Sequence, residues 1–321
     1  MKPVPRLYRA LPRRDTAAPS ALTIGNFDGV HRGHQAILAQ VRSQAQALGL
    51  EPTVMTFSPH PRAFFARQGG RLELIPTQIS SLRDKVALLA AHGMRQIVIQ
   101  RFNRHLADMG AEDFIRQLLV QGLNTRWLLV GEDFRYGHKR SGDIDLLRRM
   151  GQEHGFTVET IADINDNHGQ RISSSALRTA LAVGNLTHSS QLLGGPFRIS
   201  GHVIHGQKLG RDLGFPTLNL RVPAPCAARS GIYIVRVHGL QDTPLPGVAS
   251  LGVRPTVTRD GPLLLETHIL DRQVNAYGKL VCVEFLEFLR DEESFPDLTT
   301  LIAAIRQDVQ GARDYFASHG L

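Results

Sequence analysis

Residues 21–34 read ALTIGNFDGVHRGH, and this stretch joins a run of β-strand character to a helix through a turn rich in glycine. From there on, short β-branched runs alternate with helical segments, the pattern of a parallel sheet with crossover helices. The helical segments 34–48, 84–92 and 112–121 are each followed directly by a glycine, which is a helix stop signal. The candidate strands are residues 21–27, 52–57, 95–102, 126–132 and 156–162. The sequence therefore predicts an open, doubly wound parallel α/β sheet of Rossmann type.

The character of the sequence changes after about residue 186. Short strands now follow one another, separated by Gly and Pro, and no crossover helix lies between them. They are residues 197–206, 231–239, 246–253, 263–270 and 280–289. A final segment, 298–316, has apolar residues at helical spacing. We expect a first domain over residues 1–186 and a second over 187–321, the second a small antiparallel barrel with a terminal helix.

Composition and charge limit the classes of function. The chain has 321 residues, 42% hydrophobic and 21% charged, which is ordinary globular composition and excludes collagen-like, coiled-coil and disordered proteins. The formal net charge of +8 lies entirely in residues 1–186, with 24 basic and 16 acidic residues, whereas residues 187–321 hold 13 of each. Residues 1–14 carry five of the basic charges, and without them the first domain has 19 basic and 16 acidic residues.

This small remaining excess suits the handling of phosphorylated small molecules and is no evidence for nucleic acid. The basic residues 1–14 form either a disordered tail or a lid over a site in the first domain. We find no signal peptide and no apolar run of membrane-spanning length, so no membrane partner is expected. Two cysteines, Cys226 and Cys282, make no disulfide framework and favour the reducing cytoplasm. The oligomeric state is left open.

The turn at residues 25–34 has the features of a phosphate site. It follows a strand and opens a helix, where main-chain N–H groups and the helix dipole favour an anion. His31 and His34 are three residues apart, so both imidazoles can face one bound anion. Taken alone, an HxxH motif is more often an ordinary Gly/His turn than a phosphate site. A zinc site is disfavoured because no third ligand follows at a suitable spacing.

The turn resembles the HxGH signature of the nucleotidyltransferase superfamily, and three further motifs follow it: TFSPHPRAFF (56–65), LLVGEDFRYGHKRSGD (128–143) and RISSSALRTAL (171–181). In this order they resemble the bifunctional bacterial riboflavin kinase/FAD synthetase family, over roughly residues 18–318. The sequence departs mildly from that pattern with Ser174-Ser175, where Ser-Thr is usual.

The resemblance implies that FMN attacks the α-phosphorus of ATP in the first domain, giving FAD and pyrophosphate. His31, His34 and Arg178 are the implied catalytic residues, and the implied ATP contacts are Gly25, Asp28, His31, His34, Ser173, Ser174 and Arg178. Phe57, Asp133, Phe134 and Tyr136 are the implied flavin contacts. Aromatic faces suit a planar isoalloxazine, although such residues also serve as core.

The most informative stretch of the second domain is HGQKLGRDLGFPTLNL (205–220). A Walker A loop is rejected because the lysine is displaced and no Ser or Thr follows it. Pro216 fixes the backbone, and Thr217 and Asn219 then project from the same side of an extended segment. Their two neutral oxygens can bind Mg²⁺ beside a phosphate, although Thr and Asn near a Pro turn are commonly plain turn residues.

This stretch resembles the riboflavin kinase signature GFPTxN, with Leu218 where alanine is more usual. The resemblance implies ATP contacts at Gly206, Gly210, Arg211, Thr217 and Asn219, and Mg²⁺ held by Thr217 and Asn219. It also implies that Glu266 is the catalytic base for the riboflavin 5′-hydroxyl; from the strand pattern alone, Glu266 could equally be an outward-facing residue. The segments 252–257 and 288–295 resemble the loops that flank the flavin and the nucleotide.

The sequence thus predicts a two-domain enzyme that makes FMN and then FAD from riboflavin and two ATP, with Mg²⁺. Three alternatives differ in class or substrate. One makes the second domain a flavin-binding regulatory module without chemistry, and the intact set of Thr217, Asn219 and Glu266 opposes it. Another treats the basic N-terminal half as a nucleic-acid-binding module. The last gives the adenylyl transfer a different acceptor, such as a pantetheine phosphate.

Overall fold

The structure is a computed structural model that describes residues 4–12, 17–166, 169–206, 210, 213–253, 261–272 and 274–320. Arg211, most of the segment 252–257, and Lys2, Arg13 and Arg14 of the basic arm lie outside the described residues. The chain forms two compact units, one of residues 1–76 and 85–173 and the other of residues 77–84 and 174–321.

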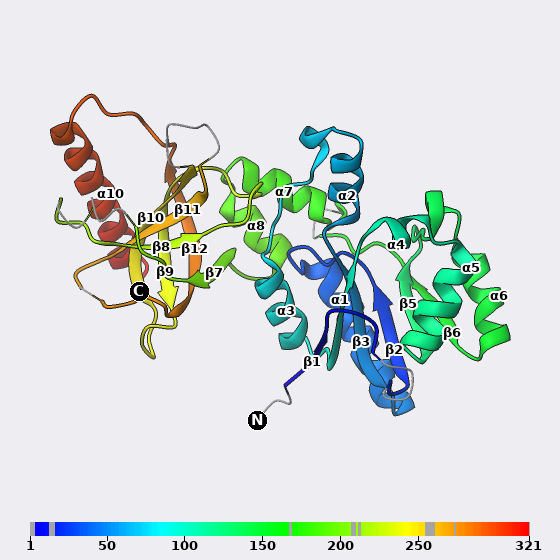
Figure 1. The fold of residues 1–321 in the computed structure, drawn as a ribbon. Helices are drawn as coiled ribbons and strands as arrows, with labels where there is room; N and C mark the ends of the chain where they lie inside the picture. The colour runs from blue at the N-terminus through cyan, green and yellow to red at the C-terminus, as the bar shows by residue number, and fades with distance from the viewer. Residues whose placement is uncertain are drawn as a thin grey trace. The chain divides into compact units, whose positions relative to one another are not determined.

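The first unit is built on a six-stranded sheet with the strand order β1-β4-β3-β2-β5-β6, in which every pair is parallel (Figure 1). The strands are β1 (Arg6–Tyr8), β2 (Ser20–Ile24), β3 (Glu51–Ser58), β4 (Gln96–Arg101), β5 (Thr125–Gly131) and β6 (Thr157–Ile161). The strand order reverses at β2, as in doubly wound folds. The predicted Rossmann-like sheet is confirmed, and the five expected strands lie within three residues of their predicted bounds.

Helices connect these strands. They are α1 (Arg32–Leu48), α2 (Pro61–Gln68), α3 (Leu82–Ala91), α4 (Arg104–Asp108), α5 (Ala111–Asp113) and α6 (Ile144–His154), with the 3-10 turns η1 (Leu72–Leu74) and η3 (His138–Arg140). The predicted α-helix at 112–121 is instead mostly a π-helix, η2 (Phe114–Gly122). Its wider turn is visible in the bond that the N–H of Leu123 donates to the carbonyl of Leu118 at 2.9 Å, five residues back.

The basic arm is in part an edge strand. Residues 6–8 pair in parallel with β4, and the N–H of Arg6 donates to the carbonyl of Arg95 at 2.8 Å. Neither a disordered tail nor a lid describes these three residues. The strand was missed because it is short and lies between prolines and arginines, where β propensity gives no signal.

The second unit is an antiparallel sheet with the order β7-β12-β9-β10-β11-β8. Its strands are β7 (Arg198–His202), β8 (Thr217–Arg221), β9 (Gly231–His238), β10 (Leu245–Val253), β11 (Leu263–Ile269) and β12 (Leu280–Arg290), and its helices are α7 (Ser174–Ala182), α8 (Leu186–Leu193) and α10 (Leu298–Ser318). A bridge between Ile204 and Asn219 brings the two ends of the sheet together, so the sheet nearly closes into the predicted barrel.

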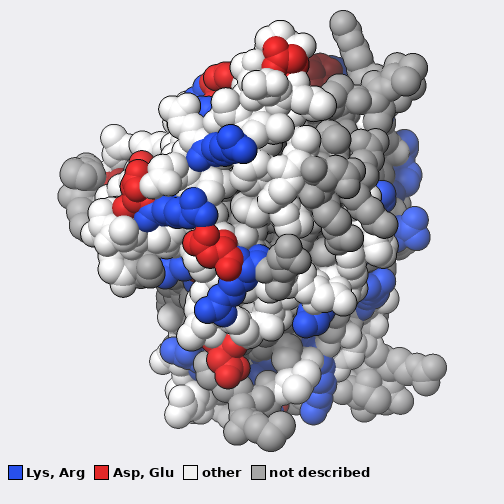
Figure 2. All heavy atoms as spheres, turned by 90° about the vertical axis from the view of Figure 1, so that its left-hand side faces the viewer, with Lys and Arg blue, Asp and Glu red and all other residues white. Residues whose placement is uncertain are grey.

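The terminal helix α10 completes the core of the second unit. Its buried residues Val309, Ala312 and Phe316 pack with Ile234 and Val248 of the sheet. Two ion pairs join the helix to the ends of strands, with Arg290 to the buried Asp308 at 2.7 Å and Arg313 to Asp271 at 2.6 Å. On the face shown in Figure 2, acidic side chains lie beside basic ones in several places, and most of the described surface carries neither.

Candidate active sites

The Gly25–His31 loop leaves the carboxyl end of β2, where the strand order of the sheet reverses. In open α/β sheets this is the position at which ligands bind. The loop backbone is unusual, because Phe27 and Val30 have positive φ angles of 47° and 44° and Gly29 has one of 80°. Phe27 and Val30 are both buried in the core, which holds them in a conformation that ordinary side chains avoid. Burial of these two side chains therefore fixes the loop before any ligand arrives.

His31 and His34 lie together at the start of α1. Their rings stack with centroids 3.7 Å apart and an interplanar angle of 19°. His31 is the N-cap of α1, and its Nδ1 accepts a hydrogen bond from the N–H of His34 at 3.4 Å. Asp28 and His31 are buried. The structure thus brings the predicted histidine pair together at the N-terminus of α1, the end of a helix that favours negative charge.

The RISSS segment approaches the same helix start. A Cβ at Gly33 would lie 3.2 Å from the carbonyl oxygen of Ile172 and 3.2 Å from Nδ1 of His31, so this contact suits glycine. Ser173 ends the first unit, whereas Ser174 begins α7 and belongs with Arg178 to the second. The Nε of Arg178 donates to the carbonyl of Thr77 at 2.7 Å. The shared phosphate site of these residues with His31 stays a prediction.

Aromatic side chains gather at the carboxyl ends of β3 and β4. Phe57 meets Phe102 edge to face at 5.8 Å, and Phe64 and Phe65 meet Phe102 at 5.4 Å and 5.7 Å. Phe65 is exposed. The sequence indicated Phe57 but missed Phe102, which follows the adjacent parallel strand and so ends at the same edge. These rings offer an apolar surface of the kind that a flavin ring requires.

The other predicted flavin residues separate into two environments. Asp133 is exposed and pairs with Arg171 at 3.2 Å, and Arg171 also pairs with Asp163 at 2.9 Å. Phe134 stacks on Tyr136 with centroids 5.6 Å apart, but Tyr136 is only 5% exposed and also packs on Phe114. Burial raises the pKa of the Tyr136 hydroxyl far above its usual range. Tyr136 therefore contributes to the core, and its contact with flavin stays a prediction.

In the second unit, the predicted kinase residues lie on adjacent strands. Asn219 on β8 is paired directly with Glu266 on β11, and Glu266 is paired on its other side with Ser250 of β10. Directly opposed residues of an antiparallel ladder share a face, so these three side chains form a row across three strands. Thr217 is on the same face, and its Oγ1 lies 3.5 Å from Nδ2 of Asn219. Asn219 is only 3% exposed.

Two positions of the proposed kinase loop require glycine because other atoms lie very close to them. A Cβ at Gly206 would lie 2.7 Å from Nδ2 of Asn219, and one at Gly210 would lie 2.5 Å from the carbonyl oxygen of Phe215. Phe215 in turn donates its N–H to the carbonyl of Gly210 at 2.6 Å. Gly206 and Gly210 thereby lie close to the segment that carries Phe215, Thr217 and Asn219. Arg211 lies outside the described residues.

Glu292 is a further residue of this site that the sequence did not single out. It follows β12, and its carboxylate accepts a hydrogen bond from the Ser250 hydroxyl at 3.1 Å and lies against the backbone of Gly252. Partial burial of the carboxyl, and then the charge of Glu266, raises the pKa of Glu292, while the Ser250 bond lowers it. A second carboxyl thus stands near Glu266. No periodic signal in a loop could have indicated this, because the contact depends on how β12 and β10 lie in the sheet.

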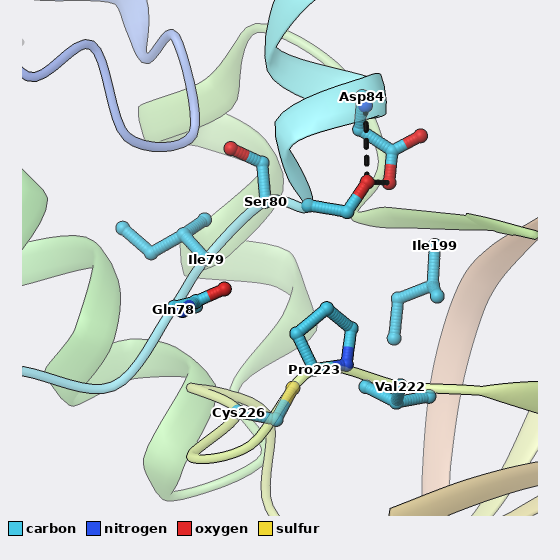
Figure 3. Close-up of a pocket in the computed structure, with 9 residues that line it drawn as sticks. Gln78, Ile79, Ser80, Asp84, Ile199, Val222, Pro223 and Cys226 are labelled. Carbon is cyan, nitrogen blue, oxygen red and sulfur yellow. Dashed lines mark hydrogen bonds between the residues drawn. The ribbon is translucent and has the colours of Figure 1, made fainter. Parts of the chain in front are cut away.

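The pocket in Figure 3 is distinct from this row of residues. Gln78, Ile79, Ser80 and Cys226 line it, together with Ile199, Val222, Pro223 and others of the second unit. Its volume of about 10 Å³ leaves room for about one water molecule. It is therefore no site for a nucleotide or a flavin. Among the described residues, no group of three or more His, Cys, Asp or Glu side chains is arranged to hold a metal ion.

Comparison with known proteins identifies the family. The FAD synthetase family model matches residues 13–176, and the riboflavin kinase family model matches residues 193–316. The bifunctional riboflavin kinase/FMN adenylyltransferase of Escherichia coli K12 is 42% identical over 295 residues, which is 92% of each chain. The chain belongs to the bifunctional riboflavin kinase/FMN adenylyltransferase family. The family predicted from the motifs is confirmed.

A further relative agrees with this membership, and a solved structure has a similar fold. The protein of the same name from Pseudomonas fluorescens is 42% identical over 291 residues, 91% of each chain. A crystal structure described as a macrolide-efflux protein from Streptococcus pneumoniae covers 97% of this chain and 99% of its own, with a TM-score of 0.75 and 25% identity. That description belongs to the other protein. Within the described ranges of the present chain, no helix is long and apolar enough to cross a membrane.

Proposed function

We propose that the chain carries out its two reactions at two separate sites, FMN adenylylation in residues 1–186 and riboflavin phosphorylation in residues 187–321. As a member of this family, it is an enzyme with both riboflavin kinase and FMN adenylyltransferase activities. The proposed boundary falls in the interval 177–192 between the two matched family segments. Riboflavin, FMN and ATP are the substrates, and FMN is the product of one reaction and the substrate of the other.

The observation that carries the kinase assignment is the row formed by Asn219, Glu266 and Ser250. We assign Glu266 as the general base: it accepts the proton of the riboflavin 5′-hydroxyl while that oxygen forms a bond to the γ-phosphorus of ATP and the bond to ADP breaks. Glu266 is partly buried between two polar neighbours, which suits a positioned base better than an outward-facing strand residue. The regulatory-module alternative has no use for this row.

Mg²⁺ fits the kinase site by the chemistry of the donors. Thr217 and Asn219 offer neutral oxygens on one face, and the missing side chain of Gly206 leaves the space beside Asn219 open. We propose that these two residues would hold the ion. When bound, it supplies positive charge to the phosphates of ATP. Gly206 and Gly210 form the adjoining nucleotide loop, and we place Arg211 there on the family motif alone.

For adenylylation, we propose that an oxygen of the FMN phosphate attacks the α-phosphorus of ATP and that pyrophosphate leaves on the opposite side. His31, His34 and the N–H groups of α1 contact the phosphates, and Gly25 and Asp28 shape the loop around the nucleotide. Ser173, Ser174 and Arg178 neutralise the charge that develops on pyrophosphate. Phe57, Phe134 and Tyr136, with Asp133, form the proposed flavin side of the site. No nucleophile from the protein is required, because positioning and charge neutralisation carry the reaction.

We further propose that the enzyme works in the cytoplasm without a nucleic-acid or membrane partner. Cys226 and Cys282 form no disulfide, which suits a reducing compartment.

Two labelled forms of ATP test the division into two reactions. With γ-³²P-labelled ATP, the label should enter FMN, and with α-³²P-labelled ATP it should enter FAD while FMN stays unlabelled. Label from the α-position in FMN, or no label from the α-position in FAD, would contradict the proposal.

A further inference from the structure

A buried lysine anchors the Gly25–His31 loop of the proposed adenylyltransferase site through a main-chain carbonyl. Lys85, in the first turn of α3, is only 8% exposed, and its Nζ donates to the main-chain carbonyl of Asn26 at 2.8 Å. The same carbonyl accepts a second hydrogen bond, from Oγ1 of Thr56 on β3, at 3.0 Å. Asn26 is thus fixed by two donors from elements that lie 30 and 59 residues away along the chain.

The orientation of this carbonyl matters because it precedes the strained part of the loop. Phe27, Gly29 and Val30 follow Asn26 with positive φ angles, and the loop then reaches Asp28 and His31. The side-chain oxygen of Asn26 is buried and has no hydrogen-bond partner among the described residues, so its main-chain carbonyl is the anchored group. Phe27 and Val30 need such anchors, since each non-glycine residue in the left-handed region costs about 1–3 kcal/mol.

A neutral donor would be sufficient to hold a carbonyl, so the choice of an ammonium group needs a separate reason. Placing a charged group in a nearly buried position carries a large desolvation cost. A positive charge behind the proposed ATP loop attracts the negative charges of the polyphosphate. It also stabilises the charge that builds up on the departing pyrophosphate. Because Lys85 is itself nearly buried, water screens its charge only weakly.

We propose that Lys85 is a positioning residue of the FMN adenylyltransferase reaction, which sets the Gly25–His31 loop through the Asn26 carbonyl and adds positive charge beneath the ATP phosphates. Thr56 also holds the Asn26 carbonyl, but it adds no charge. The inference rests on the proposed assignment of adenylylation to the first domain.

The test uses the full-length enzyme with Lys85→Met, which keeps the length of the side chain and removes the charge. We expect kcat/KM for ATP in FAD formation to fall roughly 10- to 100-fold, the range for losing a hydrogen bond to a charged group. KM for FMN and the rate of FMN formation from riboflavin should stay within about twofold of the wild type, because the kinase reaction uses other residues. This division between ATP and FMN is one that a merely structural residue would not produce.

Thr56→Val supplies a second, uncharged perturbation, and Thr53→Val is its matched control. Both threonines are buried on β3, but the Thr53 hydroxyl donates to the carbonyl of Glu51 and not to the loop. Thr56→Val should lower kcat/KM for ATP by several-fold, less than Lys85→Met, and Thr53→Val should not change it. Because Lys85 and Thr56 share one acceptor, the double variant should show a non-additive loss.

The proposal is overturned if Lys85→Met forms FAD within about twofold of the wild-type rate, or if both activities fall together. Equal effects of Thr56→Val and Thr53→Val would also overturn it. A wild-type enzyme that converts riboflavin to FMN but forms no FAD would contradict the proposed function itself, and the inference with it.

Discussion

Glu266 on β11 faces Asn219 on β8 across an antiparallel ladder, and the two residues are direct partners in its register. This pairing joins two motifs that lie 47 residues apart in the sequence, the GFPTLN stretch and the LLLETHIL strand. The residue proposed to hold Mg²⁺ and the residue proposed as general base are thereby held on one face of the sheet. A site built on paired strands keeps its geometry better than one built on loops alone.

Removing the charge of Glu266 should separate the two activities. Glu266→Gln should lower the rate of FMN formation by about 10²- to 10⁴-fold, the usual contribution of a general base, and leave conversion of FMN to FAD intact. The measurement is the rate of each reaction by chromatography of the flavins. Glu287→Gln, an exposed residue on β12 of the same sheet, is the control and should change neither rate. Full kinase activity in Glu266→Gln would remove Glu266 from the mechanism.

His31 tests the other site. His31→Asn keeps a residue that can cap α1, because Asn is among the preferred N-caps, but removes the imidazole. FAD formation should fall by about 10²- to 10³-fold, comparable to losing one donor to a developing charge, and FMN formation should be unchanged. His105→Ala, at an exposed histidine in α4, serves as the control. If His31→Asn lowered both activities equally, the two sites would not be independent.

Most of the fold could be predicted because each element carries a local signal. The β-branched runs and the glycines after the helices predict the bounds of these elements to within a few residues. The five expected strands of the first sheet are all present. The arm strand Arg6–Tyr8 could not be read, since its stability comes from pairing with β4. The π-helical turn at 114–122 was also missed, because apolar spacing does not distinguish it from an α-helix.

The residues of the candidate sites also divide into those that carry a local sequence signal and those that do not. Motifs contiguous in sequence, such as His31 with His34 and Thr217 with Asn219, are adjacent in the structure as their spacing predicts. Lys85, Phe102 and Glu292 reach these sites from distant elements, and no local pattern marks them. Tyr136 is the reverse case, a residue that a motif indicates but that the structure buries. The motif alone could not reveal that its ring packs against Phe114.

The space beside Asn219 should tolerate no methyl group. In Gly206→Ala the new Cβ would lie 2.7 Å from the Asn219 amide, and Asn219 is too short and too buried to move away freely. We expect the kinase kcat/KM to fall roughly ten- to a hundredfold, since a displacement of about 1 Å at a reacting centre can cost this much. FAD formation should not change. Gly195→Ala, where a Cβ meets nothing within 4 Å, is the matched control, and equal activity of both variants would refute the close approach.

The raised pKa of Glu292 predicts how stability depends on pH. Glu292 is exposed as a residue, but its carboxyl is partly desolvated against Ser250 and Gly252 and faces the charge of Glu266. A carboxyl whose pKa is higher in the folded than in the unfolded state favours folding when protonated, and this contribution is lost as the pH rises through the folded pKa.

In Glu292→Gln the side chain is neutral at every pH, so the variant does not lose stability from ionisation of residue 292 as the pH rises. Its thermal midpoint should exceed that of the wild type near neutral pH, and the difference should disappear below the ordinary carboxyl pKa of about 4.3. The measurement is the midpoint of unfolding of both proteins from pH 4 to pH 8. Glu293→Gln, at the exposed neighbouring residue, should show no such trend. A difference that grew toward low pH would contradict the sign of the shift.

The most direct test of the two-reaction account follows all products of the wild-type enzyme at once. Riboflavin, ATP and Mg²⁺ are incubated with the full-length chain, and FMN, FAD, ADP and pyrophosphate are quantified over time. We predict that FMN appears before FAD, that one ADP forms for each riboflavin consumed, and that one pyrophosphate forms for each FAD. FAD formed without an equal amount of pyrophosphate, or riboflavin consumed without ADP, would contradict the account.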